Sequence, residues 1–373
     1  MIVNTKEFQE KCKDILFAID SKQLTNLADK VELVLENNNF ILNTTNKQYF
    51  VSIKFTIDNP KLESFRVTVD AKLFLNLIAK LTTETITLNA KDTYLQVKSN
   101  GTYKIPYIFD NDKMLVVPEI KYKTETTNFK IKLKYLLDIY NYNTKEVLKA
   151  TIESPVNDKH YLDEHGCITY NNGACITSFE LDTPIRILID NKVAKLFKLF
   201  KSDEVSCHLG LNAISSDIIQ TIFILDDGIT KISSIVNYDT KLFDWFPIDA
   251  LRKDMCNDLP YSIVIDKNNL VNSLSRLKLF NSGLNTKAIK VNLEIQKDKI
   301  IISDINDNNN EELEISNTIN SLESTYSTKL FVNDLDSTLK NITDQYLTIN
   351  FGNNQAFIIV RDNIKIIIPE ATD

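Results

Sequence analysis

The fold is decided by the stretch RVTVDAKLFLNLI at residues 66–78, whose pattern returns as RILIDNKVAKLF at 186–197 and TKLFVNDLDSTL at 328–339. In each copy an alternating apolar run predicts a β-strand. A polar residue that suits a helix N-cap then follows, at Asp70, Asp190 and Asn333 or Asp334. The apolar spacing after it predicts an amphipathic helix. Three copies of one strand-to-helix segment indicate an internal repeat.

Each copy has another helix start upstream and a strand-rich stretch downstream. The upstream starts are IVNTKEF (2–8), KIKLKYL (130–136) and VIDKNNL (264–270). In the first, Phe8, Cys12, Ile15 and Leu16 form one apolar helical stripe. Downstream, alternating strands are joined by Asn-, Asp- and Gly-bearing turns. We therefore predict an α+β chain of three tandem modules, each with two helices packed on antiparallel sheet: domain 1 (1–122), domain 2 (123–255) and domain 3 (256–373).

The composition excludes several classes of protein. The 373 residues are 43% hydrophobic and 25% charged, which is typical of a soluble protein with buried cores. The net charge of −7 argues against a uniformly basic nucleic-acid binder, although DNA responds to the charge of one face. The first residues do not form a secretory signal, and no apolar run is long enough to span a membrane. Five scattered cysteines favour a reducing cytoplasm over a disulfide framework or zinc site: Cys12, Cys167, Cys175, Cys207 and Cys256.

Three such modules in tandem resemble the bacterial DNA polymerase III beta subunit, the sliding clamp, over essentially the whole chain. VTVDAKLFLNLIAKL (67–81) is similar to the second helix of the family's first domain, FPIDALR (246–252) to the segment that enters its third domain, and KIIIPE (365–370) to its apolar tail. The turn NNGACI (171–176) departs from the family, because it lacks the usual His and Arg. We interpret so divergent a clamp from an AT-rich genome as phage-encoded.

The resemblance implies a head-to-tail homodimer that closes a ring of six modules, with strands outside and twelve helices around the hole. Helix axes packed ~8–10 Å apart give a circumference of ~100–120 Å. Such a ring measures ~32–38 Å between opposite helix axes, and subtracting the ~10 Å thickness of a helix leaves a hole of ~22–28 Å, which accommodates a DNA duplex. The implied function is that of a processivity factor, not an enzyme, that encircles double-stranded DNA and tethers the replicative polymerase. No cofactor is expected.

Helices that line a DNA channel should be more basic than the rest of the chain. The predicted helices span 6–19, 71–81, 132–142, 192–201, 267–280 and 334–342; their net charge is +9, which leaves −16 for the remainder. We expect their cations to contact phosphates without reading sequence. A solvated lysine-rich face is the alternative for DNKVAKLFKLFK (190–201) taken alone. The expected DNA-facing residues are Lys72, Lys80, Lys132, Lys134, Lys192, Lys195, Lys198, Lys201, Arg276 and Lys278.

The family binds short peptides of the polymerase and the clamp loader in a hydrophobic pocket between its second and third domains. Apolar walls suit leucine and aromatic side chains, whose burial contributes ~25 cal/mol per Å². The alternative is that Ile366 and Ile368 complete a buried strand and that Pro247 ends one. Carried over by position, the pocket lining is Val147, Gly173, Ile176, Pro247, Leu251, Ile366, Ile368 and Pro369.

The family also pairs an edge strand of its first domain with the third domain of a second subunit. The resemblance implies a dimer interface at Tyr103, Ile105 and Tyr107, which alternate along one predicted strand. The implied interface also includes Leu279 and Phe280, which end the first helix of domain 3. The same alternation describes any half-buried strand.

No enzymatic motif stands out. Seven dispersed glycines cannot form a G-x-G-x-x-G or phosphate-binding loop. His160, His165 and Cys167 have no fourth ligand at metal spacing, so we interpret the histidines as loop residues of a polar hairpin. DINDNNNEELEI (304–315) lacks the glycine and final glutamate of a calcium loop and predicts a hairpin turn. Two alternatives stay open: a repeat-built structural or interaction scaffold that does not encircle DNA, and a nuclease or other hydrolase of unrecognised type.

Overall fold

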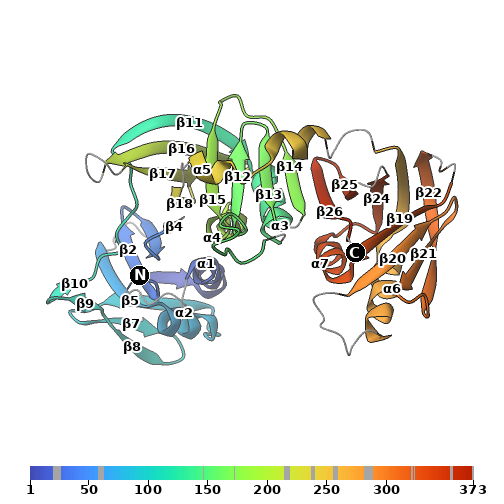
Figure 1. Ribbon diagram of the computed structural model, residues 1–373. Helices are drawn as coiled ribbons and strands as arrows, with labels where there is room; N and C mark the ends of the chain where they lie inside the picture. Colours follow the sequence, from blue (N-terminus) through green and yellow to red (C-terminus); the bar gives the residue numbers. More distant parts are fainter. Residues whose placement is uncertain are drawn as a thin grey trace. The chain divides into compact units, whose positions relative to one another are not determined.

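The chain folds into two compact units in which antiparallel sheet predominates over helix. Unit 1 comprises Met1–Leu136 and Lys195–Asn237, and unit 2 comprises Leu137–Ala194 and Tyr238–Asp373 (Figure 1). The computed structural model describes residues 1–19, 27–57, 63–145, 147–171, 173–213, 219–236, 240–254, 259–280, 289–320, 322, 324–352 and 356–371.

Unit 1 contains an eight-stranded sheet in the order β11-β16-β17-β18-β4-β3-β2-β5, a four-stranded sheet in the order β1-β6-β7-β8, and a hairpin of β9 and β10. The strands are β1 (Ile2–Asn4), β2 (Lys30–Glu36), β3 (Asn39–Thr45), β4 (Tyr49–Thr56), β5 (Phe65–Asp70), β6 (Thr85–Ala90), β7 (Tyr94–Lys98), β8 (Thr102–Pro106), β9 (Phe109–Asp110), β10 (Lys113–Met114), β11 (Thr124–Lys132), β16 (Glu204–Ala213), β17 (Ile219–Asp226) and β18 (Thr230–Val236). The helices are α1 (Thr5–Ala18), α2 (Ala71–Ala79) and the 3₁₀ helix η2 (Lys195–Leu199).

Local chemistry explains how the helices and turns of unit 1 begin. The side chain of Asn4 caps α1 by accepting two backbone N–H groups of the first turn. Asp70 caps α2 by accepting the N–H of Leu73 at 2.8 Å, which confirms the predicted cap. A cap of this kind contributes about 1 kcal/mol. Asn37 and Asn38 both have positive φ, as the tight turn between β2 and β3 requires.

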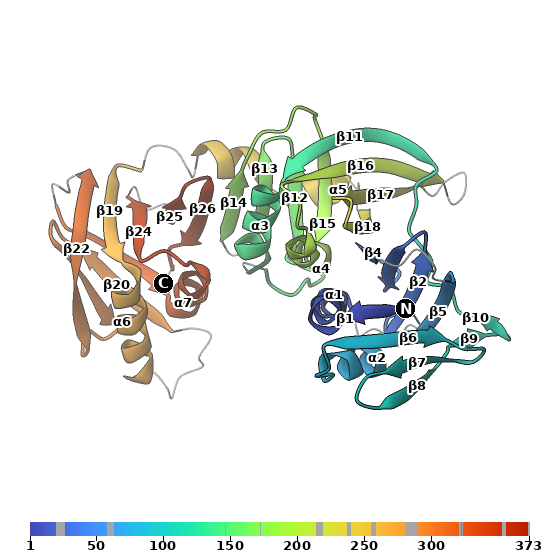
Figure 2. The ribbon, with the colours of Figure 1, turned by 180° about the vertical axis from the view of Figure 1, so that it is seen from behind.

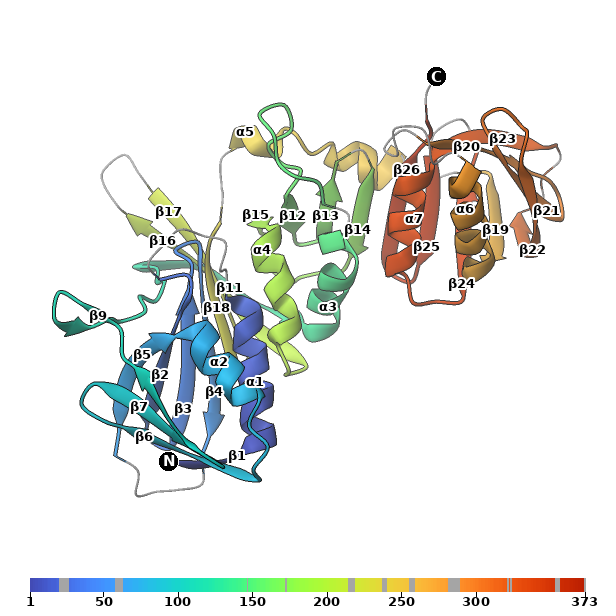
Figure 3. The ribbon, with the colours of Figure 1, turned by 90° about the horizontal axis from the view of Figure 1, so that it is seen from below.

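The helices α1 and α2 lie side by side against the sheets of unit 1 (Figure 3). The ring of Phe8 on α1 lies 5.6 Å from that of Phe40 and 6.2 Å from that of Phe74 on α2, measured between centroids. Such tilted and edge-on ring contacts add to the free energy gained by burial. Phe8 and Ile15 of the predicted stripe are buried, whereas Leu16 remains exposed.

Unit 2 is built on one twelve-stranded sheet in the order β15-β12-β13-β14-β26-β25-β24-β19-β22-β21-β20-β23. The strands are β12 (Lys159–Asp163), β13 (Gly166–Tyr170), β14 (Ala174–Ser178), β15 (Arg186–Asp190), β19 (Tyr261–Asp266), β20 (Lys290–Ile295), β21 (Lys299–Asp304), β22 (Asn310–Asn320), β23 (Tyr326–Phe331), β24 (Tyr346–Phe351), β25 (Ala356–Arg361) and β26 (Ile364–Pro369). The helical elements are α3 (Leu133–Asn141), whose residues from Leu137 belong to this unit, η1 (Asn143–Lys145), α4 (Asn191–Ala194), α5 (Thr240–Phe243), the π-helical turn η3 (Ala250–Asp254), α6 (Lys267–Phe280) and α7 (Val332–Asn341).

Two apolar clusters form the core of unit 2. The Leu274 cluster packs α6 and α7 on strands β19 to β26 and includes the buried residues Leu274, Leu335 and Ile349. The strand β26 contributes to both clusters, because successive side chains of a strand point to opposite faces. The second, called the Phe246 cluster, has as its buried members Val156, Tyr161, Ile168, Ala174, Ile176, Leu188, Phe243, Phe246, Leu251, Ile358 and Ile367.

One order of elements occurs three times along the chain: a strand, a helix, four strands, a helix and three strands, from β1 to β8, from β11 to β18 and from β19 to β26. The last strand of the second series pairs with the fourth strand of the first, β18 with β4. The last strand of the third series likewise pairs with the fourth strand of the second, β26 with β14 (Figure 2). The last strand of the first series, β8, lies at an edge of its sheet.

Helices occur at all six predicted places, with two corrections. The segment predicted as one α-helix at 192–201 is a single α-helical turn, α4, followed by the 3₁₀ helix η2. A 3₁₀ helix has three residues per turn, so lysines spaced by three align along η2. The predicted cap of α7 at Asn333 or Asp334 is wrong, because β23 runs directly into the helix and its N-cap is Phe331, without a side-chain cap.

Candidate functional site

Five of the predicted DNA-facing lysines are exposed and form no ion pair with the residues that the structure describes. Lys80 is the C-cap of α2, and Lys132 ends β11 immediately before α3. An ammonium group without a carboxylate partner can pair with a phosphate of a polyanion. The five lysines are Lys72, Lys80, Lys132, Lys134 and Lys195.

The lysine-rich segment of α4 and η2 presents its cations opposite an apolar side. Val193, Leu196 and Phe197 are buried, whereas Lys192 and Lys195 are exposed. Within unit 1, the Lys198 ammonium lies 3.1 Å from the centroid of the Phe17 ring of α1, a cation–π contact that fixes the side chain.

Lys201, which follows η2, has an acidic neighbour. Its Nζ lies 3.7 Å from Oδ2 of Asp14 on α1, and about half of the lysine side chain is exposed. An ion pair that is so long and so exposed is weak. Lys201 therefore remains available to a phosphate.

The predicted cations of α6 are held in tight ion pairs. The Arg276 guanidinium donates from Nε to Oε1 of Glu311 at 2.6 Å and from Nη2 to the other carboxylate oxygen. Lys278 donates to Oδ2 of Asp336 on α7, and Lys340 donates to the same oxygen at 2.8 Å. The sequence predicted Arg276 and Lys278 as cations available to DNA, but each has its charge balanced within unit 2.

The carboxylates of these pairs are stabilised in the ionised form. The hydrogen bond from Arg276 is the main reason why the pKa of Glu311 lies below its usual value. Burial by itself would raise the pKa of Asp336, but the hydrogen bonds and charges of Lys278 and Lys340 outweigh it and lower the pKa. Both acids therefore remain charged at neutral pH.

The helices as observed are still more basic than the rest of the chain. Over α1, α2, α3, α4 with η2, α6 and α7 the net charge is +6, so the remainder carries −13. The asymmetry is smaller than over the predicted bounds, because Lys80, Lys132 and Lys201 lie just outside the observed helices.

Of the residues predicted to line the peptide pocket, two are buried in the Phe246 cluster. Ile176 on β14 and Leu251 on η3 are buried there together with Ile367 of β26. Ile366 and Ile368, which were predicted to line the pocket, belong instead to the Leu274 cluster. The alternation along β26 sends Ile367 to one side of the sheet and its two neighbours to the other.

The remaining predicted pocket residues lie nearer the surface. Gly173 packs against the backbone of β26, since a Cβ on it would lie 2.3 Å from the carbonyl oxygen of Ile367 and 3.3 Å from Cδ of Pro369. Only glycine fits there. Pro247 is half-buried, and its carbonyl accepts the N–H of Leu251 at 2.9 Å. Val147 is also half-buried, in the segment that follows η1.

An ion pair that the sequence analysis missed joins η3 to β12. The Arg252 guanidinium on η3 donates to both oxygens of Asp163 on β12, each at 2.6 Å. Burial would lower the pKa of Arg252, but the hydrogen bonds and charge of Asp163 raise it. A bidentate pair fixes orientation as well as distance, so it positions η3 and therefore Leu251. The two residues are 89 positions apart, which left no local signal to find them.

Comparisons with known proteins identify the fold of the chain. Residues 1–113 match the family model described as DNA polymerase III beta subunit, N-terminal domain. No curated protein sequence matches the chain. Three similar solved structures are a Pseudomonas aeruginosa sliding clamp, DNA polymerase III subunit beta, bound to griselimycin (13% identity, TM-score 0.78), the Thermotoga maritima beta subunit (15%, 0.75) and the Streptococcus pneumoniae beta chain (16%, 0.74), each matched over 100% of this chain and 99% of the other.

The chain has the sliding-clamp fold. The resemblance to the DNA polymerase III beta subunit that the sequence predicted is confirmed. The clamp fold of this chain is α+β, with mostly sheet and few helices.

On the clamp fold, the predicted interface residues differ in their accessibility. Tyr103 on β8 is 38% exposed, but Ile105 is 1% and Tyr107 6% exposed. The side chains of Ile105 and Tyr107 therefore pack inside unit 1, where the Tyr107 hydroxyl accepts the N–H of Lys91. Leu279 and Phe280, at the end of α6, are largely exposed.

The histidines that we interpreted as loop residues of a hairpin have different surroundings in the clamp fold. His160 is a wholly buried residue of β12, so the loop prediction is wrong for it. Its Nδ1 lies 2.7 Å from the hydroxyl of Thr169 and its Nε2 3.1 Å from Oδ1 of Asn191. His165 lies in the turn between β12 and β13. Within the described residues, no group of three or more His, Cys, Asp or Glu is arranged to hold a metal ion.

The segment that we compared with a calcium loop is a hairpin turn between β21 and β22, as predicted. The Asp304 carboxylate accepts the N–H groups of Asn306 and Asn308 and the amide of Asn309. The turn thus satisfies its own acceptors. Among the described helices, none is long and apolar enough to cross a membrane.

Proposed function

We propose that this chain is a sliding clamp, a non-enzymatic processivity factor that encircles double-stranded DNA and tethers a DNA polymerase to it. The supporting observation is the exposed lysines of α2, α3, α4 and η2 on a fold that matches sliding clamps along its whole length. Contacts to phosphate carry no sequence information, which a protein that slides requires.

The repeated order of elements supports three clamp domains at 1–122, 123–255 and 256–373. Within the chain, the eighth strand of one series pairs twice with the fourth strand of the series before it. The eighth strand of the first series, β8, and the fourth strand of the third series, β22, have no such partner among the described strands. If the same pairing joins two copies, β8 of one copy meets β22 of the other. This head-to-tail pairing closes a homodimeric ring of six domains.

The two strands offer complementary edges for this seam. β8 carries the exposed cation Lys104, and Glu312 and Glu314 are exposed on β22. The stretch Asn310–Glu314 of β22 pairs with β21 on one side, while β19 pairs with the later part of the strand. The exposed Leu279 and Phe280 of α6 are the apolar groups that we propose contribute to the same interface, with Tyr103 from the other copy.

The proposed partners besides DNA are the polymerase and the clamp loader, bound through short peptides at the Phe246 cluster. Its half-buried members Tyr170, Ile248 and Val360 are accessible above the buried Ile176 and Leu251. We place the protein in the cytoplasm of a bacterium or of a phage-infected cell. Cys12, Cys167, Cys175 and Cys207 are free and buried, which suits a reducing compartment.

The decisive experiment is retention on DNA of different topology. A closed ring loaded on nicked circular DNA stays bound and dissociates when the DNA is linearised, because it slides off the ends. The protein should also sediment as a dimer of about 85 kDa, twice the 42.7 kDa chain. Equal dissociation from circular and linear DNA would instead favour a repeat-built interaction scaffold that does not encircle DNA.

A further inference from the structure

The only tryptophan of the sequence lies in an unusual position. Trp245 is 45% exposed, although Phe243 and Phe246 beside it are buried. These two phenylalanines hold the segment in place, with ring centroids 5.8 and 5.7 Å from that of Tyr161. The indole is therefore presented to solvent from a fixed backbone. Exposed, well-supported Trp residues are enriched at the centres of binding sites.

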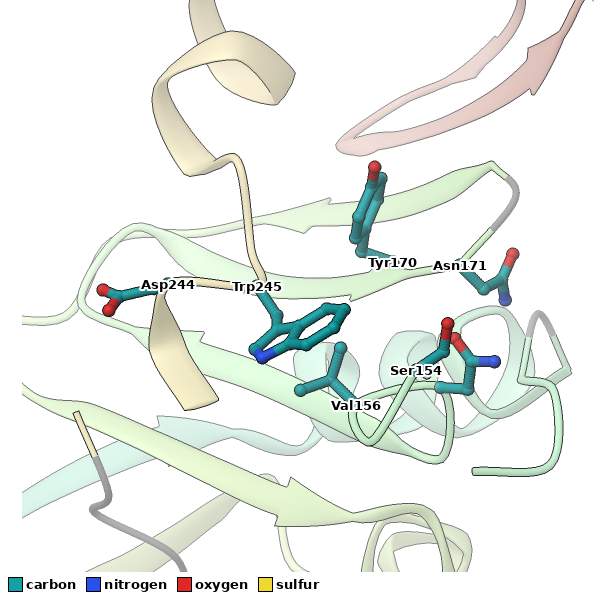
Figure 4. A pocket seen from close by; sticks show the side chains of 7 residues that line it. Ser154, Val156, Tyr170, Asn171, Asp244 and Trp245 are labelled. Carbon is teal, nitrogen blue, oxygen red and sulfur yellow. The ribbon is translucent and has the colours of Figure 1, made fainter. Parts of the chain in front are cut away.

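A cavity of about 560 Å³ opens beside this indole (Figure 4). Trp245 and Tyr170 contribute aromatic walls, and Val156 points toward the indole from the loop that precedes β12. The loop is held by backbone hydrogen bonds between Thr151 and Ser154 and from Lys159 to Val156. Val156 itself is buried in the Phe246 cluster. This wall of the cavity is therefore held by contacts within the chain.

The polar groups of the cavity are available to a ligand. Within the described residues, the hydroxyls of Ser154 and Tyr170 and the amide of Asn157 form no side-chain hydrogen bond, yet all three residues are half-buried. Because these residues are only half-buried, their polar groups remain accessible to a ligand in the cavity. Each of them offers an oxygen that accepts a hydrogen bond.

The charge of the cavity has one sign. Among the described residues that line it, Asp244 is the only ionisable one besides the tyrosine, and none of them is a cation. The Asp244 carboxylate turns away from the indole in Figure 4, so it contributes a negative field without filling the space. Exposed Glu153 adds a second negative charge next to Ser154. The field therefore favours a cation over an acid.

A guanidinium group matches these features together. It stacks on aromatic faces, carries a permanent positive charge and presents five N–H donors to surrounding oxygens. The same segment already shows this preference within the chain, because the Arg186 guanidinium lies 4.3 Å from the centroid of the Phe243 ring. A carboxylate would meet an acidic field, and a purely aliphatic side chain would leave the hydroxyls and the amide unpaired.

We propose that this cavity binds an arginine side chain of the partner peptide that docks on the Phe246 cluster. The inference rests on the proposed function, which supplies such a peptide. Tyr170 joins the two surfaces, because it lines the cavity and also packs on the cluster. A peptide with its apolar anchor on the cluster then reaches the cavity with a neighbouring residue.

Trp245 reports directly on the test, since its fluorescence is that of the only indole in the chain. The full-length protein is titrated with acetyl-Leu-Leu-Arg-Leu-amide and with the same peptide carrying citrulline, which keeps the shape of arginine without its charge. The arginine peptide should change the emission of Trp245 and bind about 5-fold more tightly than the citrulline peptide. Equal affinities, or an unchanged emission with both peptides, would overturn the proposal.

Two variants separate the roles of the ring and of the charge. Trp245→Leu should abolish the preference for arginine over citrulline, measured by calorimetry. Asp244→Asn should weaken binding of the arginine peptide about 2- to 3-fold, as expected for one exposed charge. Asp182→Asn is the matched control, because it removes an exposed acid of unit 2 that does not line the cavity.

The thermal unfolding midpoint of each variant shows whether it is folded. A normal preference for arginine in folded Trp245→Leu would also overturn the proposal. Retention on circular DNA is measured in parallel. If the unmodified protein is not retained, the clamp function is refuted but the arginine result is unaffected, so the two failures are distinguishable.

Discussion

The α4–η2 segment and the α6–α7 pair are both rich in cations, but they differ in what balances those cations. In the first, Lys192 and Lys195 are exposed and Lys198 rests on an aromatic ring. In the second, Arg276 is locked to Glu311, and Lys278 shares Asp336 with Lys340. A count of charges along the sequence treats the two regions alike. Within the described residues Lys195 has no carboxylate partner, so we expect the α4–η2 segment to offer more charge to DNA than α6 and α7 do.

The largest effect is expected from reversing the lysines of α4 and η2. Replacing Lys192, Lys195 and Lys198 with Glu should shorten retention on nicked circular DNA and flatten its dependence on salt. The loss of three phosphate contacts lowers the slope of log K against log salt by about 2.7. Filter retention or single-molecule dwell times between low and moderate salt measure this slope. An unchanged slope in a folded triple variant would remove these lysines from the DNA-facing surface.

The second effect tests the cations of the α6–α7 pair. Asp336→Asn removes the one carboxylate that Lys278 and Lys340 share, which adds one net positive charge and should steepen the salt dependence of DNA retention by about 0.9 in slope. It should also lower the free energy of unfolding by about 1–2 kcal/mol, because the Asp336 side chain is nearly buried and links α6 to α7. Asp344→Asn is a control that breaks an exposed pair with Arg361. A slope equal to that of the unmodified protein would mean that α6 and α7 do not face DNA.

Much of this fold could be predicted from the sequence because its signals are local. The cap at Asp70 lies three residues from the N–H that it accepts, and the turn at Asp304 satisfies itself within five residues. The repeat of strand and helix patterns gave the order of the elements and the places of the helices. Such features depend on residues that are close in the sequence, so a single sequence suffices to find them.

The parts that could not be predicted depend on contacts between distant residues. The partners of the Lys278–Asp336 and Arg252–Asp163 pairs are 58 and 89 positions apart, and no sequence pattern near one partner predicts the other. The phase of β26 is a different case. Alternation predicts that Ile366 and Ile368 share one face, but only the neighbouring strands decide which cluster that face meets.

A smaller effect concerns the dependence of stability on pH. The pKa values of Asp336 and Glu311 are lowered in the folded chain, so their pairs stabilise it fully above the unfolded values of about 4. This contribution is lost as the pH falls through the folded values. The difference in unfolding free energy between the unmodified protein and Asp336→Asn should stay constant above about pH 5 and shrink below about pH 4. Chemical denaturation at a series of pH values measures it. A difference that grows on acidification would reverse the assigned direction.

The smallest effect is expected from Arg276→Lys, which keeps the charge but removes the bidentate geometry. Lysine can donate to only one oxygen of Glu311 at a time, and the site is more than half exposed on the arginine side, so the loss of stability should be below about 1 kcal/mol. The salt slope of DNA retention should not change, since the same single charge remains balanced by the same carboxylate. Lys195→Gln, which removes one unbalanced charge and no pair, should by contrast lower the slope by about 0.9. If both variants shift the slope equally, pairing within unit 2 does not shield Arg276, and the contrast between the two helical regions is one of position alone.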